Sequence, residues 1–462
     1  MPSEPRFRRE GPEGAADRQR ALALVLRHGF EATSFQALES GCCYFFHGSE
    51  ACVAYVDTGG AWVAAGSPIA PFRARAETVS AFLSAAQSAG KRACFFATEQ
   101  PLFGARGEAL VTLSIGEQPI WDPHAWPLVL AKHRSLREQL RRARAKGVST
   151  RALTRREYEP GETRAAIERV AERWLGGRAM APMGFLVSVE PFAYASERCC
   201  FVAEQDGCIV GFAGVIPVPA RNGWFIEDLV RDPKAPNGTS EVLVNEAMRW
   251  AAARGSAWLT LGLAPLSGEL TDTLRRISRH ARVLYDFAGL RAYKAKFRPD
   301  RWLPLYLCHP PSQPAWLSLL DALSAFTQGG LLRFSWRTLV RGPTVVLRAL
   351  AFLLVPWTIS LALVPSERWF RAASIKWAWV CFDVALALGL FRLLRRPRRA
   401  LLTALALAVS ADALVTTLKV LIWNVPRIQS RFDYLVLLLA CAAPTLAAIV
   451  LWGARRHRLR FL

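Results

Sequence analysis

Polar and charged side chains gather where a predicted strand meets a predicted helix, in the segment 225–244, FIEDLVRDPKAPNGTSEVLV. Asp228 and Arg231 stand at the carboxyl end of the strand, and Asn237 or Thr239 is placed to cap the helix that follows. The first turn of such a helix presents free backbone N–H groups and a positive dipole end, which suit a phosphate or a developing oxyanion. An ordinary strand–turn–helix joint, with Asp228 paired to Arg231, explains the same residues equally well.

A strongly basic helix is predicted over residues 132–146, KHRSLREQLRRARAK, which carry seven Lys or Arg and a single acid, Glu138. Four arginines recur at three- and four-residue spacing and therefore share a helix face: Arg134, Arg137, Arg141 and Arg144. A solvated charged helix is the plainer interpretation, but this density favours a face that meets phosphates. The spacing does not choose between tRNA and an anionic membrane leaflet.

Two later segments extend the pattern: LGLAPLSG at 261–268 and YDFAGLRAYKAKFRPDRWLPLYL at 285–307. Together with 225–244 they resemble the C-terminal domain of bacterial phosphatidylglycerol lysyltransferases, the aminoacyl-phosphatidylglycerol synthases that include the multiple peptide resistance factor. The likeness covers roughly residues 25–308. The residues that carry it are Asp228, Leu229, Arg231, Ala235, Pro236, Asn237, Gly238, Glu241, Gly262, Ala264, Pro265, Leu266, Leu290, Arg291, Tyr293, Lys294, Lys296 and Phe297.

The resemblance implies a reaction, the transfer of an aminoacyl group from aminoacyl-tRNA to a hydroxyl of phosphatidylglycerol. It also implies three catalytic candidates. Asp228 would orient or deprotonate the lipid hydroxyl, or hold the amino group of the transferred amino acid. Arg231 would neutralise the lipid phosphate or the oxyanion, and Glu241 would contact the cationic amino group.

Substrate binding falls to a second set of residues. By the resemblance, Lys294 and Lys296 would hold tRNA or lipid phosphate. The remaining substrate-binding candidates are Asn237, Gly238, Tyr293, Arg137, Arg141 and Arg144. The expected partners are aminoacyl-tRNA and an anionic phospholipid, and the resemblance implies no cofactor. Ten scattered cysteines, with no C-x-x-C and no paired histidine spacing, predict neither a metal site nor a disulfide framework.

Alternating strand and helix patterns predict an α/β (α+β) fold that positions these residues. The resemblance implies tandem acetyltransferase-like (GNAT) halves, which we place at residues 21–127 and 128–308. A disordered basic arm is expected over 1–20 and a linker with a short amphipathic helix over 309–342. Because the first twenty residues are polar and lack an apolar core segment, they do not resemble a signal peptide.

Charge and apolar residues are both abundant, at a formal net charge of +22 and 52% hydrophobic residues, which is unusual for one soluble domain. The last 122 residues carry 17 Lys or Arg and four acids and contain the longest apolar runs. Four transmembrane helices are predicted in 343–453: 343–364, 375–394, 400–423 and 434–453, followed by a basic tail, 454–462. Arginine-rich loops on one side predict a multi-pass protein of the bacterial inner membrane, with the catalytic domain and both termini cytoplasmic.

Two other function classes compete with aminoacyl transfer. One is a GNAT-type transferase that uses acyl-CoA at the membrane, although the loop 231–238 offers a single glycine for a pyrophosphate. The other is a non-catalytic, membrane-anchored binding protein. Relatives of this kind usually carry their membrane helices before the transferase domain, whereas here the predicted helices follow it.

Overall fold

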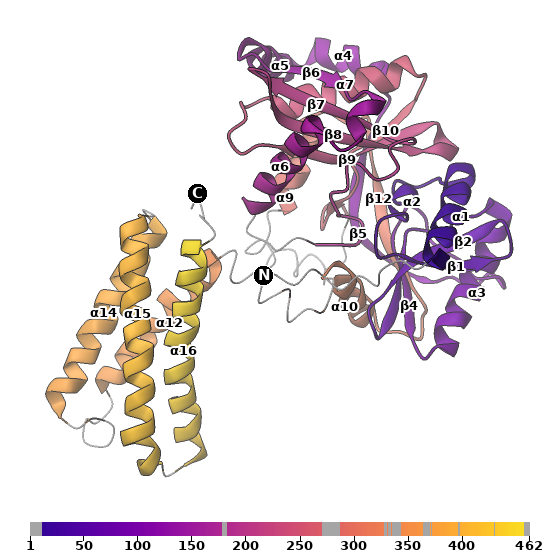
Figure 1. The fold of residues 1–462 in the computed structure, drawn as a ribbon. Helices are drawn as coiled ribbons and strands as arrows, with labels where there is room; N and C mark the ends of the chain where they lie inside the picture. The colour runs from indigo at the N-terminus through magenta and orange to yellow at the C-terminus, as the bar shows by residue number, and fades with distance from the viewer. Residues whose placement is uncertain are drawn as a thin grey trace. The chain divides into compact units, whose positions relative to one another are not determined.

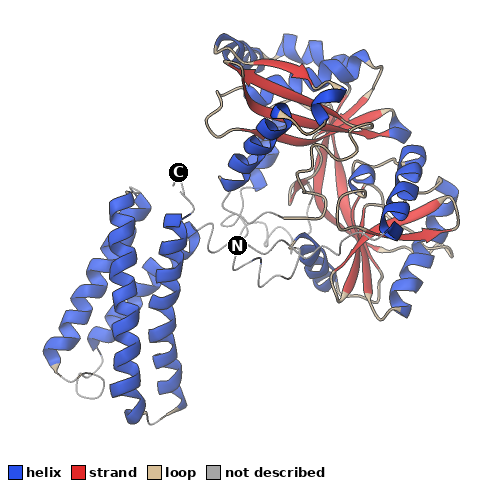
Figure 2. Cartoon of the chain, viewed as in Figure 1, coloured by secondary structure: helices blue, strands red, loops and turns tan. Residues whose placement is uncertain are grey.

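The computed structural model describes residues 12–177, 183–269, 287–327, 343–363, 372–395, 398–428 and 430–456, with isolated residues between them. The chain divides into two compact units. The first comprises Met1–Leu175 with Pro182–Leu331, and the second Leu332–Leu462 with Gly176–Ala181. The first unit contains an α/β sheet with its covering helices, and the second is helical (Figures 1 and 2).

Twelve strands of the described residues form one sheet, in the order β1-β2-β3-β4-β12-β5-β10-β9-β8-β7-β6, with β11 paired to β5. The strands are β1 Cys43–His47, β2 Ala51–Asp57, β3 Ala61–Ala65, β4 Arg92–Thr98, β5 Val111–Trp121, β6 Ser149–Ala152, β7 Cys199–Gln205, β8 Cys208–Val218, β9 Gly223–Arg231, β10 Trp258–Thr260, β11 Ala264–Pro265 and β12 Arg301–His309.

The helices of the first unit cover both faces of this sheet. They are α1 Pro12–His28, α2 Thr33–Gln36, α3 Arg75–Ser88, α4 Trp126–Lys132, α5 Arg134–Ala145, α6 Glu162–Gly176, α7 Thr239–Ala253, α9 Phe287–Ala295 and α10 Ala315–Phe326, with short 3₁₀ turns including η4 Pro219–Arg221. Helix α3 packs on one face of the first strands, and α1, α2 and α10 contribute to the core on the other. Around strands β7 to β10 of the same sheet, α4, α5 and α7 pack in one hydrophobic core and α6 packs in another.

One structural pattern occurs twice along the sheet. Strands β1, β2 and β3 form an antiparallel meander, and α3 then leads to β4, which runs parallel to β3. Strands β7, β8 and β9 form a second meander, and α7 leads to β10, which runs parallel to β9. The tandem α/β architecture expected from the resemblance is therefore confirmed.

The two halves are joined more closely than separate domains would be. Strand β12 lies between β4 and β5, so the end of the second half completes the sheet of the first. Residues 12–20 lie in α1, so the expectation that the whole of 1–20 is a disordered arm is wrong, because Ala21, Leu24 and Val25 of this helix pack into the core. Residues 1–11 lie outside the described part of the chain.

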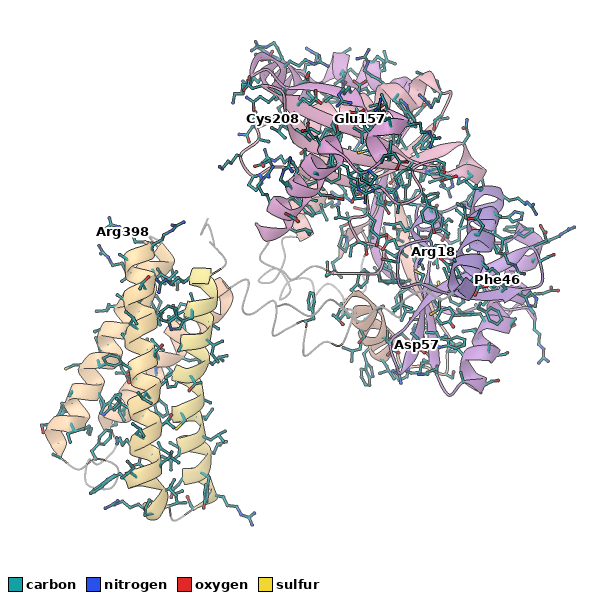
Figure 3. All side chains as sticks on the ribbon, viewed as in Figure 1. Arg18, Phe46, Asp57, Glu157, Cys208 and Arg398 are labelled. Atoms are coloured by element: carbon teal, nitrogen blue, oxygen red, sulfur yellow. The ribbon has the colours of Figure 1, made fainter. Side chains whose placement is uncertain are left out.

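The second unit contains α12 Pro343–Leu363, α14 Ala373–Arg395, α15 Arg399–Lys419 and α16 Arg431–Arg456. Three helical stretches of the described residues are long and apolar enough to cross a membrane: Ala373–Leu394, Arg399–Arg427 and Asp433–Arg455. In α12 the apolar stretch Leu350–Leu363 is shorter, so a fourth span stays a prediction. Arg398, labelled in Figure 3, immediately precedes α15.

Candidate functional site

Strand β9 and the loop after it place the residues of the first predicted motif. A register shift opposite Gly214 and Val215 leaves Glu227 without a partner in the ladder between β8 and β9. Such a bulge alters the alternation of side chains and can turn two neighbouring residues toward one region. Asp228 is only 4% exposed, and it faces Gly214, where an added Cβ would lie 3.0 Å from its Oδ2 atom.

Asp228 and Arg231 are not paired. They are three positions apart on one strand, and successive side chains of a strand point to opposite faces. Val230 packs in the core beside α6, whereas Leu229 packs in the core beside α7. Asp228 therefore shares the face of Val230, and Arg231 shares the face of Leu229, so the two predicted catalytic residues belong to different surroundings.

Three acidic residues lie close to Asp228. Glu227 precedes it on the strand, Glu39 follows α2, and Glu190 lies in the loop before β7. Burial is the main cause that raises the pKa of Asp228 well above its usual value, and the neighbouring charges of Glu227 and Glu190 raise it further. Burial and nearby acids raise the pKa values of Glu39 and Glu227 in the same direction.

Arg198 partly compensates this acidic cluster, which we define as Glu39, Glu190, Glu227 and Asp228. Its guanidinium lies 3.5 Å from Oε2 of Glu227, and it donates a hydrogen bond of 2.8 Å to the backbone oxygen of Glu190. Among the described residues, Oδ2 of Asp228 and Oε1 of Glu39 have no hydrogen-bond partner. Because buried carboxylates are normally paired, the cluster has the chemistry to accept a cation or protons.

A second group of predicted residues gathers at the beginning of α7. Glu241, in its first turn, forms an ion pair with Lys296, whose Nζ also lies 4.7 Å from the ring centroid of Tyr293. Burial raises the pKa of Tyr293, and the charge of Arg231 acts in the opposite direction. The Glu241 carboxylate is thus already neutralised by Lys296, an arrangement that differs from a free contact with a substrate amino group.

Arg231 and Gly238 fix the conformation of the loop that connects β9 to α7. The guanidinium of Arg231 is 3.4 Å from Oδ1 of Asn237 and 3.5 Å from the backbone oxygen of Ala235. Gly238 is the residue that caps the helix, with φ of 102°, and neither Asn237 nor Thr239 caps it through a side chain. The predicted cap is therefore wrong, because the left-handed backbone at this position favours glycine.

The side chain of Lys294 points to residues 261–263 rather than to the loop between β9 and α7. Its ammonium donates three hydrogen bonds, of 2.8, 2.9 and 2.8 Å, to the backbone oxygens of Leu261, Gly262 and Leu263. Burial lowers the pKa of Lys294 to about 7, while the three carbonyl oxygens favour its charged form. Lys294 uses its three donors to hold the turn after β10, which leaves no free donor for the expected contact with phosphate.

The basic helix is α5, and it packs beside the loop that connects β9 to α7. Its apolar residues Leu136, Leu140 and Ala143 are buried, and a Cβ added at Gly238 would lie 2.8 Å from the Cβ of Ala143. Arg141 forms an exposed ion pair with Glu138. The α5 helix thus presents its charged face to solvent close to the beginning of α7.

The three predicted arginines of α5 are all exposed but differ in their contacts. Arg137 donates a hydrogen bond of 2.6 Å to the backbone oxygen of Leu130 and a second one to Ala131, at the end of α4. Arg144 is also exposed, two turns along the helix. Arg137 therefore has a structural task beside any role in binding, whereas Arg141 and Arg144 are better placed to meet a ligand.

Sequence reasoning missed three members of the acidic cluster and their arginine. Glu227 had a local signal, because two consecutive acids in a strand cannot both face solvent. Glu39, Glu190 and Arg198 had none, since only the fold brings these distant positions to β9. Of the predicted residues, Arg231, Asn237, Gly238, Glu241, Tyr293 and Lys296 come together near the start of α7, whereas Asp228 and Lys294 face elsewhere.

The model of the family described as phosphatidylglycerol lysyltransferase, C-terminal, matches residues 22–309. The chain belongs to this family. It is 26% identical over 297 residues to phosphatidylglycerol lysyltransferase of Staphylococcus epidermidis, which covers 61% of this chain and 34% of the relative. It is 24% identical over 280 residues to the lysylphosphatidylglycerol biosynthesis bifunctional protein of Mycobacterium avium, covering 57% of this chain and 23% of that protein. The chain therefore spans only 34% and 23% of these relatives' lengths.

Solved structures agree with the fold of this family member. The C-terminal domain of a protein described as a lysylphosphatidylglycerol synthetase from Agrobacterium fabrum matches with a TM-score of 0.59 and 26% identity, over 69% of this chain and 98% of that domain. L-PGS from Bacillus licheniformis matches with a TM-score of 0.56 and 20% identity, over 67% of this chain and 96% of that one, which supports the fold alone.

Proposed function

We propose that this protein transfers an aminoacyl group, lysyl foremost, from aminoacyl-tRNA to a hydroxyl of phosphatidylglycerol or a related anionic lipid. The lipid hydroxyl attacks the ester carbonyl of the donor, a new ester bond forms, and the bond to the ribose oxygen breaks. The proton of the lipid hydroxyl leaves with the released ribose hydroxyl. The relatives' names supply the lysyl group and the lipid, and tRNA as donor rests on the resemblance.

The observation that carries the proposal is the acidic cluster. A lysyl group brings two ammonium groups, and Asp228 and Glu39 each keep a buried carboxylate oxygen without a partner. An ammonium placed between them would supply hydrogen bonds and opposite charge to groups that are unfavourable when buried alone. This favours the hypothesis that Asp228 holds the amino group over the hypothesis that it deprotonates the lipid.

The polyanionic substrates would meet the face of the sheet opposite Asp228, where Arg231 and α7 lie. Gly238, at the start of α7, packs against Ala143 of α5, and the exposed arginines of α5 add positive charge to this part of the surface. Helix N-termini and guanidinium groups both favour phosphate oxygens. We assign Arg231 to contact with phosphate, and Arg141 and Arg144 to contact with the tRNA or the leaflet. The ion pair between Glu241 and Lys296 fixes the start of α7.

Lipid analysis of a bacterial host that lacks aminoacylated lipids tests the proposal. Expression of the full chain should produce lysyl-phosphatidylglycerol, detected by mass spectrometry, and Asp228→Asn should reduce it at least 100-fold at equal membrane abundance. Arg249→Gln, an exposed change on α7, is the matched control. In isolated membranes, ribonuclease should abolish product formation. Unchanged lipids with normal expression would refute the proposal, and product formation that survives ribonuclease but needs acyl-CoA would assign the protein to the other transferase class.

A further inference from the structure

Helix α10 carries an exposed apolar stripe in the first unit. Trp316, Leu320 and Leu323 are 62%, 41% and 53% exposed. At 100° per residue these three positions fall within about 60° of one another, so they form one face of the helix. Single exposed apolar residues are ordinary on a protein surface, but an aligned tryptophan and two leucines form a patch.

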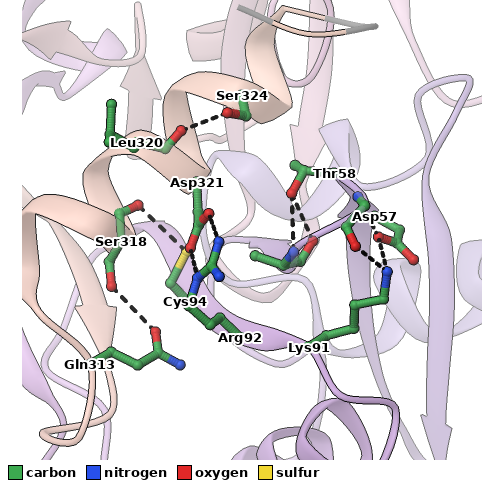
Figure 4. Close-up of polar contacts among 12 residues, drawn as sticks. Asp57, Thr58, Lys91, Arg92, Cys94, Gln313, Ser318, Leu320, Asp321 and Ser324 are labelled. Atoms are coloured by element: carbon green, nitrogen blue, oxygen red, sulfur yellow. Dashed lines mark hydrogen bonds and ion pairs between the residues drawn. The ribbon is translucent and has the colours of Figure 1, made fainter.

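The opposite face of α10 is fixed to the sheet. Ser318, Asp321, Ala322 and Ala325 are buried. Asp321 accepts two hydrogen bonds from Arg92 of β4, of 2.8 and 2.6 Å, and Leu320 lies away from this contact (Figure 4). Because Asp321 is the only charged residue of the helix, the exposed stripe has no charge of its own. The helix is therefore held rigidly with its apolar side outward.

The chain itself indicates what covers this stripe. Sixteen residues, 327–342, separate α10 from Pro343 of α12, at the start of the helical unit with membrane-spanning character. A segment of this length can extend at most about 60 Å, so the chain limits how far α10 can move from the start of α12. The segment contains Arg333, Arg337 and Arg341 and no acid, which is the composition that anionic leaflets attract.

We propose that the Trp316–Leu320–Leu323 face of α10 docks on the surface of the anionic bilayer. Tryptophan and leucine on a helix that lies in the interface plane, with basic residues nearby, are typical of interfacial membrane helices. Docking places the sheet unit against the leaflet through a rigid element of its own, besides the covalent connection. Its consequence for catalysis, delivery of the site to lipid headgroups, rests on the proposed function.

Photochemical cross-linking tests the docking without reference to activity. The full chain is reconstituted in nanodiscs of phosphatidylglycerol and phosphatidylethanolamine, with p-benzoylphenylalanine replacing Leu323. Adducts to lipid should form at least five times more often than with the same group at Arg249, an exposed position of α7. Adducts mainly to a second copy of the chain, or to neither, would overturn the proposal.

Negative charges introduced into the apolar face of α10 provide a second test in the same cross-linking experiment. With the photoreactive group at Leu323, the changes Trp316→Glu and Leu320→Glu together should lower lipid adducts at least five-fold, because an ionised carboxylate resists transfer into the interface. Ser312→Glu, an exposed change just before the helix, should leave them unchanged. Equal adducts in all three proteins would contradict a docking role, and melting temperatures check that each variant is folded.

Measurements of aminoacylation on two forms of the lipid distinguish the docking of α10 from the proposed function. Leu320→Glu should lower aminoacylation of phosphatidylglycerol in a bilayer at least five-fold and leave aminoacylation of a dispersed short-chain phosphatidylglycerol within two-fold. A wild-type chain that aminoacylates neither lipid would refute the proposed function, while the cross-linking result would still decide the docking. Equal losses on both lipids would show that the variant damages the site, and would overturn the delivery role.

Discussion

Asp228 lies in a buried strand with an unpaired carboxylate oxygen and with Glu227 and Glu190 close by. Such an arrangement is unfavourable unless protons or a cation neutralise it. The raised pKa values favour the protonated carboxyl groups, and a bound ammonium would favour the ionised ones. The state of these carboxyl groups therefore depends on the substrate.

Binding of a lysyl ester should consequently release protons. L-lysine methyl ester, an analogue of the donor ester, stabilises the ionised carboxylates, so its affinity should rise as the pH rises through the pKa of the cluster and fall in acid. Calorimetry of the full chain in buffers of different ionisation enthalpy measures the release. Norleucine methyl ester, which lacks the second ammonium, should bind at least ten-fold more weakly, about 1.4 kcal/mol. Equal binding of the two esters, or no proton release, would contradict the assignment.

Lys294 provides a second prediction at this scale. Replacing it with Met removes the donor to the backbone oxygens of Leu261, Gly262 and Leu263, and leaves buried acceptors unpaired. The free energy of unfolding should fall by about 2–4 kcal/mol. Thermal melting of the full chain in detergent, followed by tryptophan fluorescence, measures the loss. Lys296→Met, at a more exposed site, should destabilise less. A Lys294→Met protein with native stability but weakened phosphate binding would restore the expectation from the sequence.

Among the elements, the basic helix α5 and the strand–loop–helix around β9 and α7 were predictable because each has a local pattern. Charge at helical spacing marked α5, and a strand followed by a proline- and glycine-containing loop marked the start of α7. Their contacts were not predictable, because the bulge at Glu227 decides which way Asp228 faces. The position of β12 between β4 and β5 also depends on pairing between residues about 200 positions apart, which no local pattern records.

Close packing of α5 against the loop before α7 can be tested at Gly238. Its φ of 102° and the 2.8 Å approach of an added Cβ to Ala143 and to the backbone oxygen of Gln139 both oppose a side chain. Gly238→Ala should therefore destabilise the protein by about 2–4 kcal/mol, the sum of backbone strain and overpacking. Gly255→Ala is the matched control, since its φ is 72° but nothing lies within 4 Å of its added Cβ. It should cost only about 1 kcal/mol. Equal losses of melting temperature in Gly238→Ala and Gly255→Ala would show that α5 shifts to accommodate the added methyl group at little cost.

At the scale of the whole molecule, the two halves of the sheet unit are joined by a buried polar contact as well as by strands. Glu99, which follows β4, is paired with Arg221 of η4, and the guanidinium of Arg221 lies 3.7 Å from the ring centroid of Phe30. Burial and the charge of Glu31 together raise the pKa of Glu99 to about 7, although the charge of Arg221 lowers it. A junction of this kind makes the cohesion of the halves sensitive to pH.

The sign of this dependence follows from proton binding. Between its ordinary value of 4.5 and about 7, folded Glu99 holds a proton that the unfolded chain has lost, so stability falls as the pH rises through this window and levels off above it. The slope from this one group is up to about 1.4 kcal/mol per pH unit. Melting temperatures of the full chain between pH 4.5 and 8 should fall less steeply in Glu99→Gln than in the wild type. Because the acidic cluster contributes in the same direction, Asp228→Asn should also flatten the profile, and the double variant should flatten it by the sum of the two. A Glu99→Gln profile parallel to the wild type would mean that Arg221 keeps Glu99 ionised throughout, and that the junction is an ordinary ion pair.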